Sequence, residues 1–144
     1  MKNFTLDVEY DYDFKVFGLV SSSKEYKLAW HISRFLQLRL KKQPDLVFDF
    51  ITKGRLVISN YLHQTEHSTF RLLRNKSWVL GTLKKPFLLP EIKDYDYIVQ
   101  ISGTLADEYL DVVQEKLRGL DPVQYLKEFD PETFRYKDNL LFDT

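Results

Sequence analysis

Short stretches in which apolar and polar residues alternate occur along the whole chain, and this pattern is typical of half-buried strands. We expect strands over residues 4–10 and 14–20, before the first helix, and over residues 95–102 and 123–129 in the C-terminal half. Between them lies a predicted β meander, whose strands cover residues 38–42, 45–51, 55–62, 68–74 and 78–80. Its first hairpin turn, at residues 52–54, ends in a glycine, which tolerates a positive φ.

Two segments instead repeat apolar residues at helical spacing. The first helix is expected from residue 23 to 37, with Ser22 and Glu25 forming a capping box at its start. Its buried face would consist of Leu28, Ala29, Ile32, Phe35 and Leu36. The second helix is capped by Thr104 with Asp107 and ends at Gly119. It would bury Ala106, Tyr109, Leu110, Val113 and Leu117.

The order of these elements is β-β-α, then a meander, then β-α-β, and it predicts one α+β domain over residues 1–144. The expected fold is a mainly antiparallel β-sheet with two principal helices packed on one face. The closing β-α-β unit would add a parallel pair of strands through a right-handed crossover. In the strand at residues 95–102, one face would hold Tyr95, Tyr97, Val99 and Ile101.

Composition excludes several classes of protein. The chain has no cysteine, which excludes disulfide scaffolds, thiol nucleophiles, thiolate zinc sites and iron–sulfur clusters. The first residues lack the apolar core of a signal peptide, and no stretch has the length and hydropathy of a membrane span. We therefore expect a cytoplasmic protein with no membrane partner and, because no cofactor-binding motif is present, with no cofactor.

Charge is unevenly distributed along the chain, although the formal net charge is +0. Residues 1–26 carry three Lys/Arg and five Asp/Glu, net −2, whereas residues 27–89 carry twelve and three, net +9. Residues 90–144 carry six Lys/Arg and thirteen Asp/Glu, net −7. The favoured interpretation is that the acidic ends neutralise the basic middle, within one chain or between two copies. The alternative is an anionic partner.

A nine-residue segment carries a resemblance to a known family. Residues 89–97 read Leu-Pro-Glu-Ile-Lys-Asp-Tyr-Asp-Tyr and resemble the I-P-E-x-x-x-V-D-Y motif of the bacterial IPExxxVDY family. The matching positions are Pro90, Glu91, Asp96 and Tyr97. Two positions differ, since Leu89 replaces isoleucine and Tyr95 replaces valine. Residues 6–14 and 139–142 also resemble that family's ends, so the similarity spans the chain. The family is one of uncharacterised proteins, so the resemblance implies no activity, cofactor or catalytic residue.

The acids of this motif allow two interpretations. In the functional one, Glu91 and Asp96 form an acid–base pair in a cleft. In the structural one, which we favour, Glu91 anchors its loop by accepting backbone N–H bonds, and Asp96 pairs with a basic strand. Pro90 fixes a backbone angle in either case.

A second group of acids lies near the N-terminus, where Asp7, Glu9, Asp11 and Asp13 alternate with apolar residues. In an extended segment the four carboxylates would share one face. Three explanations remain open: pairing with the basic meander, a solvated face, or a hard cation such as Mg²⁺ or Ca²⁺. The spacing lacks the glycine and terminal glutamate of an EF-hand loop, so we predict no metal site here.

The histidines give no metal or catalytic motif either. His63 and His67 are four residues apart, but Glu66 precedes the second histidine, whereas a zincin helix needs glutamate directly after the first. His31 lies on the first predicted helix and is expected at the edge of the core. The serines at 21–23 lack the flanking glycines of a nucleophile elbow. We therefore name no catalytic residue.

The basic meander supports a nucleic-acid hypothesis. Its cations are Arg39, Lys41, Lys42, Lys53, Arg55, Arg71, Arg74 and Lys76. Tyr61 and Trp78 could supply rings for stacking, and basic strands with exposed rings are typical of single-strand binders. A pI near 6.8 and the lack of an RNP-type motif count against this hypothesis.

The leading functional hypothesis is a non-enzymatic protein-interaction module that associates with itself, since the charges are complementary and no catalytic set is present. Its expected partner is a protein, including a second copy of the chain as a homodimer. The alternative is a weak single-stranded nucleic-acid binder that uses the basic meander. A metal-dependent hydrolase that uses the acids at residues 7–13 is the third hypothesis.

Overall fold

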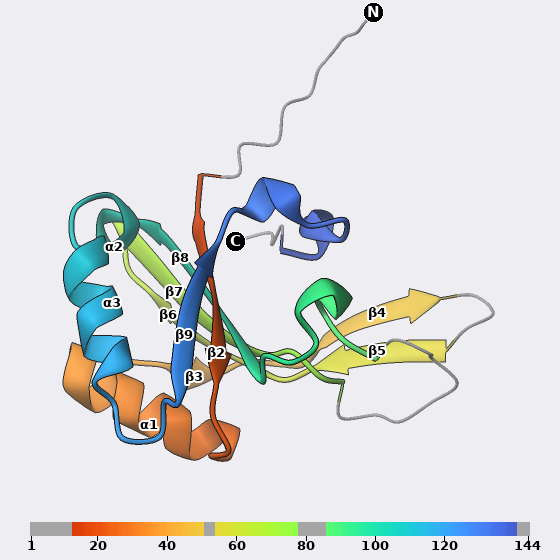
Figure 1. Cartoon of the computed structure of the whole chain (residues 1–144), viewed down its shortest axis with the longest axis horizontal. Coiled ribbons are helices and arrows are strands. Elements are labelled where there is room, and N and C mark those ends of the chain that lie inside the picture. The colour runs from red at the N-terminus through yellow and green to blue at the C-terminus, as the bar shows by residue number, and fades with distance from the viewer. Residues whose placement is uncertain (1–12, 51–53, 78–85, 141–144) are drawn as a thin grey trace, which may run out of the picture.

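The computed structural model describes residues 13–50, 54–77 and 86–140, and these form an α+β fold with a six-stranded antiparallel sheet (Figure 1). In spatial order its strands are β3 (Lys41–Lys42), β6 (Asn60–Gln64), β7 (Ser68–Arg74), β8 (Tyr97–Gly103), β2 (Lys15–Val20) and β9 (Tyr125–Phe129). The predicted fold class is therefore confirmed. The predicted strands at residues 4–10 and 78–80 lie outside the described residues.

A second, two-stranded sheet extends away from the main one, and it consists of β4 (Leu46–Phe50) and β5 (Gly54–Ile58) (Figure 1). The single strand expected over residues 55–62 is wrong, because the chain leaves this hairpin at Ser59 and enters β6 in the main sheet. The two halves of that run thus belong to different sheets. Residues 52 and 53 of the predicted hairpin turn lie outside the described residues.

The first described strand, β2, lies inside the main sheet, where it pairs antiparallel with β8 on one side and with the edge strand β9 on the other. The predicted parallel pair at the end of the chain is therefore wrong, since β8 and β9 run in the same direction but β2 separates them. The burial of β2 explains this arrangement. Val16, Phe17 and Leu19 are all fully buried, so this strand needs a neighbour at each edge and a covered surface on each face.

One face of the sheet is covered by a helix layer, which consists of α1 (Glu25–Leu36), α2 (Thr104–Asp107) and α3 (Leu110–Arg118). Leu28 and Ile32 of α1 and Leu117 of α3 pack with Phe17 and Phe70 of the sheet. Packing of the helices on one face is therefore confirmed. The second helix is divided into α2 and α3, and this break leaves its predicted core residue Tyr109 53% exposed.

The first predicted helix is confirmed, but its expected buried face is only partly correct. Phe35 is 53% exposed and stacks on His31 at the outer surface of α1, with 6.2 Å between the ring centroids. The capping box is wrong, because Lys24 is the N-cap and makes no side-chain cap bond. Thr104 is the first residue of α2 instead of its cap. Gly119 follows α3 as predicted, and its N–H donates to Glu115 O.

The opposite face of the sheet has its own core. It is covered by three short 3₁₀ turns, η1 (Pro90–Ile92), η2 (Pro131–Thr133) and η3 (Lys137–Leu140), together with the chain around them. Leu88, Leu89, Ile92 and Leu140 pack here with Ile98 of β8. Tyr95 also packs on this side, so placing it on one face with Tyr97 is wrong. The reason is that β8 begins only at Tyr97, after a turn in which Tyr95 N–H donates to Ile92 O.

The helices of the described residues are all too short or too polar to cross a membrane.

Candidate functional site

The motif segment, residues 89–97, is organised around Asn75, which is fully buried. The Asn75 side-chain NH₂ donates to Ile92 O and Tyr95 O, each at 3.1 Å, and its Oδ1 accepts from Leu89 N–H at 2.9 Å. One amide therefore bonds to three backbone groups of the segment, and two of them, Leu89 N–H and Tyr95 O, have no other partner among the described residues. The sequence places Asn75 only in a turn, and nothing in its local pattern reveals this role.

Glu91 binds the C-terminal part of the chain, because its carboxylate accepts a hydrogen bond from Arg135 N–H. Nearby, Asn139 Nδ2 donates to Leu88 O at 2.9 Å, so two polar contacts join the motif side to the last described turns. Glu91 thus anchors backbone in the way that the structural interpretation expects. Pro90 occupies the first position of η1, where its missing N–H is not needed.

Asp96 and Tyr97 hold the loop that enters α1. Asp96 Oδ2 accepts from Ser21 N–H at 2.9 Å, and the Tyr97 hydroxyl donates to Ser23 O at 2.6 Å. Asp96 therefore binds a loop N–H instead of the predicted basic strand. Burial and the nearby Glu25 carboxylate raise the pKa of Tyr97 to about 12, so its hydroxyl stays protonated and donates at neutral pH. Glu91 and Asp96 therefore bind the backbone of different segments, Glu91 at Arg135 and Asp96 at Ser21.

Glu25 fixes the first turn of α1 from another direction, since its Oε1 accepts from the Ser59 hydroxyl between β5 and β6. Its Oε2 is buried and has no hydrogen-bond partner among the described residues. Burial raises the pKa of Glu25, and the Ser59 hydrogen bond and the charges of Lys42 and Arg74 oppose this increase. The start of α1 is thus held by Asp96, Tyr97 and Ser59 together.

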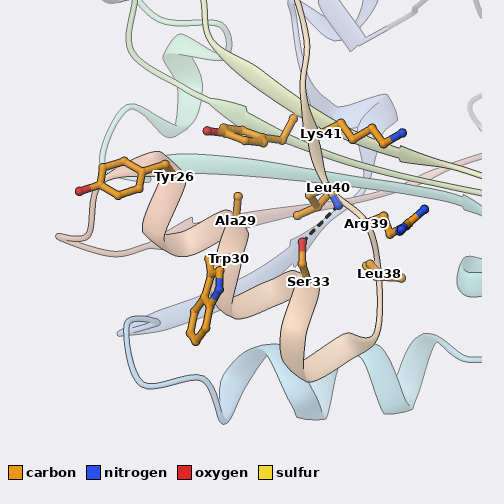
Figure 2. A pocket seen from close by; sticks show the side chains of 9 residues that line it. Tyr26, Ala29, Trp30, Ser33, Leu38, Arg39, Leu40 and Lys41 are labelled. Carbon is orange, nitrogen blue, oxygen red and sulfur yellow. Dashed lines mark hydrogen bonds between the residues drawn. The ribbon is translucent and has the colours of Figure 1, made fainter.

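The C-terminal end of α1 is held by local contacts. Gln37 adopts a left-handed conformation with φ 57°, and Leu38 N–H then donates to Ser33 O at 2.9 Å. Leu40 N–H donates to the Ser33 hydroxyl at 3.1 Å, which binds the segment entering β3 to the middle of the helix (Figure 2). Both ends of α1 and the start of β3 are therefore fixed relative to one another.

An open groove of about 520 Å³ lies between α1 and β3. Its lining, which we call the aromatic–basic groove, is Tyr26, Ala29, Trp30, Ser33, Leu38, Arg39, Leu40, Lys41 and Tyr61. Figure 2 shows the Tyr26 and Trp30 rings projecting from α1, while Arg39 extends from the segment before β3 and Lys41 from the start of β3. A smaller hollow of about 370 Å³ adjoins it and shares Arg39 and Lys41.

The aromatic side chains of the groove are unusually accessible. Tyr26 is 57% exposed and Trp30 is 56% exposed, and the Arg34 guanidinium lies 5.5 Å from the centroid of the Trp30 ring. Arg39 and Lys41 are exposed and form no ion pair with any described side chain. Exposed rings with exposed cations beside them are features of a binding surface.

The predicted basic set does not form one surface. Arg71 is 7% exposed and donates to Asn60 Oδ1, whereas Arg55 pairs with Asp49 at 2.9 Å and Lys42 pairs with Asp45 at 3.0 Å. Arg74 and Lys76 are exposed at the far end of β7. Arg74 is close enough to the Glu25 carboxylate for its charge to lower the pKa of Glu25. Arg39 and Lys41 remain at the groove. Lys53 and the predicted stacking residue Trp78 lie outside the described residues.

The acid row and the histidines form no site in the described part of the chain. Asp7, Glu9 and Asp11 lie outside the described residues, and Asp13 is exposed. His63 Nδ1 accepts from Arg39 N–H at 2.9 Å, and His67 lies 3.9 Å from its exposed neighbour Glu66. Within the described ranges, no group of three or more His, Cys, Asp or Glu side chains could hold a metal ion.

The exposed rings of α1 were not predicted from the sequence. A signal for them exists, because Tyr26, Trp30 and Arg34 follow one another at four-residue spacing outside the predicted buried face.

No protein-family model matches this chain, and no curated protein matches it.

Proposed function

We propose that this protein is a non-enzymatic protein-interaction module that associates with itself through its helix layer. The observation that carries the proposal is the position of the exposed apolar side chains. Of the eight large hydrophobic residues that are exposed in the described part of the chain, five belong to the helix layer or to the Glu108–Tyr109 break within it. These are Tyr26, Trp30, Phe35, Tyr109 and Val112. Contiguous exposed apolar surface marks interaction sites in soluble proteins.

The composition of the groove supports a protein partner. Tyr, Trp and Arg are the residues that contribute most to binding at protein interfaces, and the groove has each of them. The contacts at both ends of α1 fix the groove before any partner binds, which reduces the entropy lost on association.

The ion pairs support self-association in particular. The two Lys/Arg pairs between described side chains, Lys42–Asp45 and Arg55–Asp49, both lie within residues 42–55, so neither joins the basic middle to the acidic C-terminal part. The exposed cations Arg39 and Lys41 and the exposed acids Asp111 and Glu115 form no ion pair with a described side chain, so their charges support contacts between copies. The absence of cysteine supports a cytoplasmic location. The four matching motif residues support membership of the IPExxxVDY family.

Sedimentation velocity over a range of protein concentrations, at low and high salt, tests the proposal. We expect a concentration-dependent dimer that weakens with salt, and Trp30→Ala should raise its dissociation constant at least about tenfold, as loss of a central aromatic contact does. The matched control is Tyr125→Ala, because Tyr125 is 55% exposed on β9, away from the helix layer. A wild-type protein that stays monomeric at low salt contradicts self-association, and loss of the dimer in the control variant alone would move the interface to β9.

Single-stranded nucleic acid is the second candidate, because Trp30, Tyr61 and Arg39 combine rings with a cation at one groove. The dispersal of the other basic residues argues against it. Fluorescence anisotropy of a labelled poly-dT oligonucleotide at 50 mM salt provides the test. Binding that Trp30→Ala abolishes would favour this function, whereas no binding would exclude it.

A further inference from the structure

We propose that the aromatic–basic groove of one copy binds an acidic ridge on the helix layer of a second copy. The ridge consists of the exposed side chains Asp107, Glu108, Tyr109, Asp111, Val112 and Glu115. This inference rests on the proposed self-association and identifies the two surfaces that meet.

The ridge has the form of a helix that docks into a groove. Val113 and Leu117 of α3 point into the core, which leaves Asp111, Val112 and Glu115 on the outer side of the helix. Tyr109, directly before α3, is 53% exposed, and Val112 is 51% exposed. Apolar residues separated by three or four positions are the anchors by which amphipathic helices bind apolar grooves. Tyr109 and Val112 have this spacing.

The charges of the two surfaces are complementary. Residues 25–42, which include α1 and β3, carry five Lys/Arg and one Asp/Glu, whereas residues 104–118 carry four Asp/Glu and two Lys/Arg. Lys116 and Arg118 lie in the last turn of α3, so its first turns are the acidic part. Neither Asp111 nor Glu115 forms an ion pair with a described side chain. Arg39 and Lys41 at the groove are equally available.

The geometry allows both contacts to form at once. α3 packs beside α1 on the same face of the sheet, so the groove and the ridge both belong to the helix layer (Figure 1). A two-fold axis near α1 would place each groove opposite the other copy's ridge. Such an isologous contact closes as a dimer and leaves no unsatisfied surface for further growth.

A charge-swap experiment tests which surfaces meet. One variant carries Arg39→Glu with Lys41→Glu, and the other carries Asp111→Lys with Glu115→Lys. Each variant alone should dissociate at least tenfold more readily than wild type at low salt, because both of its contacts then join like charges. An equimolar mixture of the two should dimerise within about threefold of wild type, since both contacts are again complementary. The control, Asp94→Lys with Glu128→Lys, makes the same charge change outside the ridge and should leave the wild-type affinity unchanged.

The outcomes separate this inference from the proposed function. If Trp30→Ala disrupts the dimer but Asp111→Lys with Glu115→Lys does not, self-association through the groove stands and the ridge is not its occupant. If the mixture does not recover, the two surfaces do not meet. A wild-type monomer overturns both proposals. Circular dichroism checks that each variant is folded. If added poly-dT competes with dimer formation, the groove binds nucleic acid instead of the ridge.

Discussion

The two faces of the sheet use their polar and aromatic residues in opposite ways. On the face with the motif segment, Asn75, Glu91 and Asn139 all bond to backbone groups of distant segments. On the helix-layer face, Tyr26, Trp30 and Phe35 are more than half exposed, and the rings of Trp30 and Phe35 both contact His31 at the surface of α1. The first face closes the fold, and the second presents side chains to a partner.

Asp96 and Tyr97 connect the two faces. They end the motif segment, yet they hold Ser21 and Ser23 in the loop that enters α1. The motif therefore positions the helix that carries the groove. A recognisable sequence motif therefore need not contain the binding residues, because its acids can hold backbone instead.

Substitution of Asn75 should have the largest effect on stability. Asn75→Ala leaves Leu89 N–H and Tyr95 O without a partner among the described residues, and Ile92 O keeps only its bond from Tyr95 N–H. Each unsatisfied group costs about 1–3 kcal/mol, so we expect the free energy of unfolding to fall by about 2–5 kcal/mol in urea titrations. Asn75→Asp keeps the volume but replaces the donor with an acceptor that faces two carbonyls, and it should be at least as destabilising. Asn139→Ala, which removes one bond to Leu88 O, should cost only about 1 kcal/mol. Equal effects of Asn75→Ala and Asn139→Ala would contradict the central role of Asn75.

Local sequence patterns were sufficient to predict most elements of this fold but not their partners. Alternation and helical spacing identified β2, β7 and α1, because these elements each bury one continuous set of side chains. The patterns could not show that β2 separates β8 from β9, since strand order depends on contacts between residues far apart in the chain. They also could not show that residues 55–62 divide between two sheets, because no glycine or proline within this run marks the break at Ser59.

The candidate site was less predictable than the fold. Arg39 and Lys41 were in the predicted basic set, but the same charge pattern included Arg71, which the fold buries against Asn60. Only tertiary structure separates a buried arginine from an exposed one. Tyr26 and Trp30 look like core residues by composition. Their exposure follows from the register of α1, in which Leu28 and Ile32 take the buried side.

The alkaline stability of the protein tests the contact between the two faces. Tyr97→Phe removes the bond to Ser23 O, and we expect a loss of about 1–2 kcal/mol at pH 7. The folded-state pKa of Tyr97 is about 12, above the ordinary value of 10.0, because burial disfavours the phenolate. Protonation of Tyr97 therefore stabilises the fold fully below pH 10, and this contribution is lost as the pH rises from 10 toward 12.

Urea titrations at pH 7 and between pH 10 and 11.5 measure this effect. The difference in stability between wild type and Tyr97→Phe should shrink over the alkaline range. Tyr125→Phe serves as the control, because Tyr125 is exposed and the change should stay within about 0.5 kcal/mol at pH 7. A difference that stays constant between pH 7 and 11.5 would show that the Tyr97 hydroxyl is not held in the buried contact.

The smallest expected effect concerns the other end of α1, which depends on local backbone instead of the motif. Gln37 is exposed and has a φ of 57°, a conformation that glycine adopts without the Cβ clash of other residues. Gln37→Gly should therefore raise the free energy of unfolding by about 0.5–1 kcal/mol, whereas Gln37→Ala keeps the strain and should not stabilise. Because Gln37 does not line the groove, the dimer dissociation constant should stay at the wild-type value in both variants. A glycine variant that is more stable but no longer dimerises would mean that the helix layer binds its partner through the last turn of α1, and the interface would have to be redrawn around Phe35.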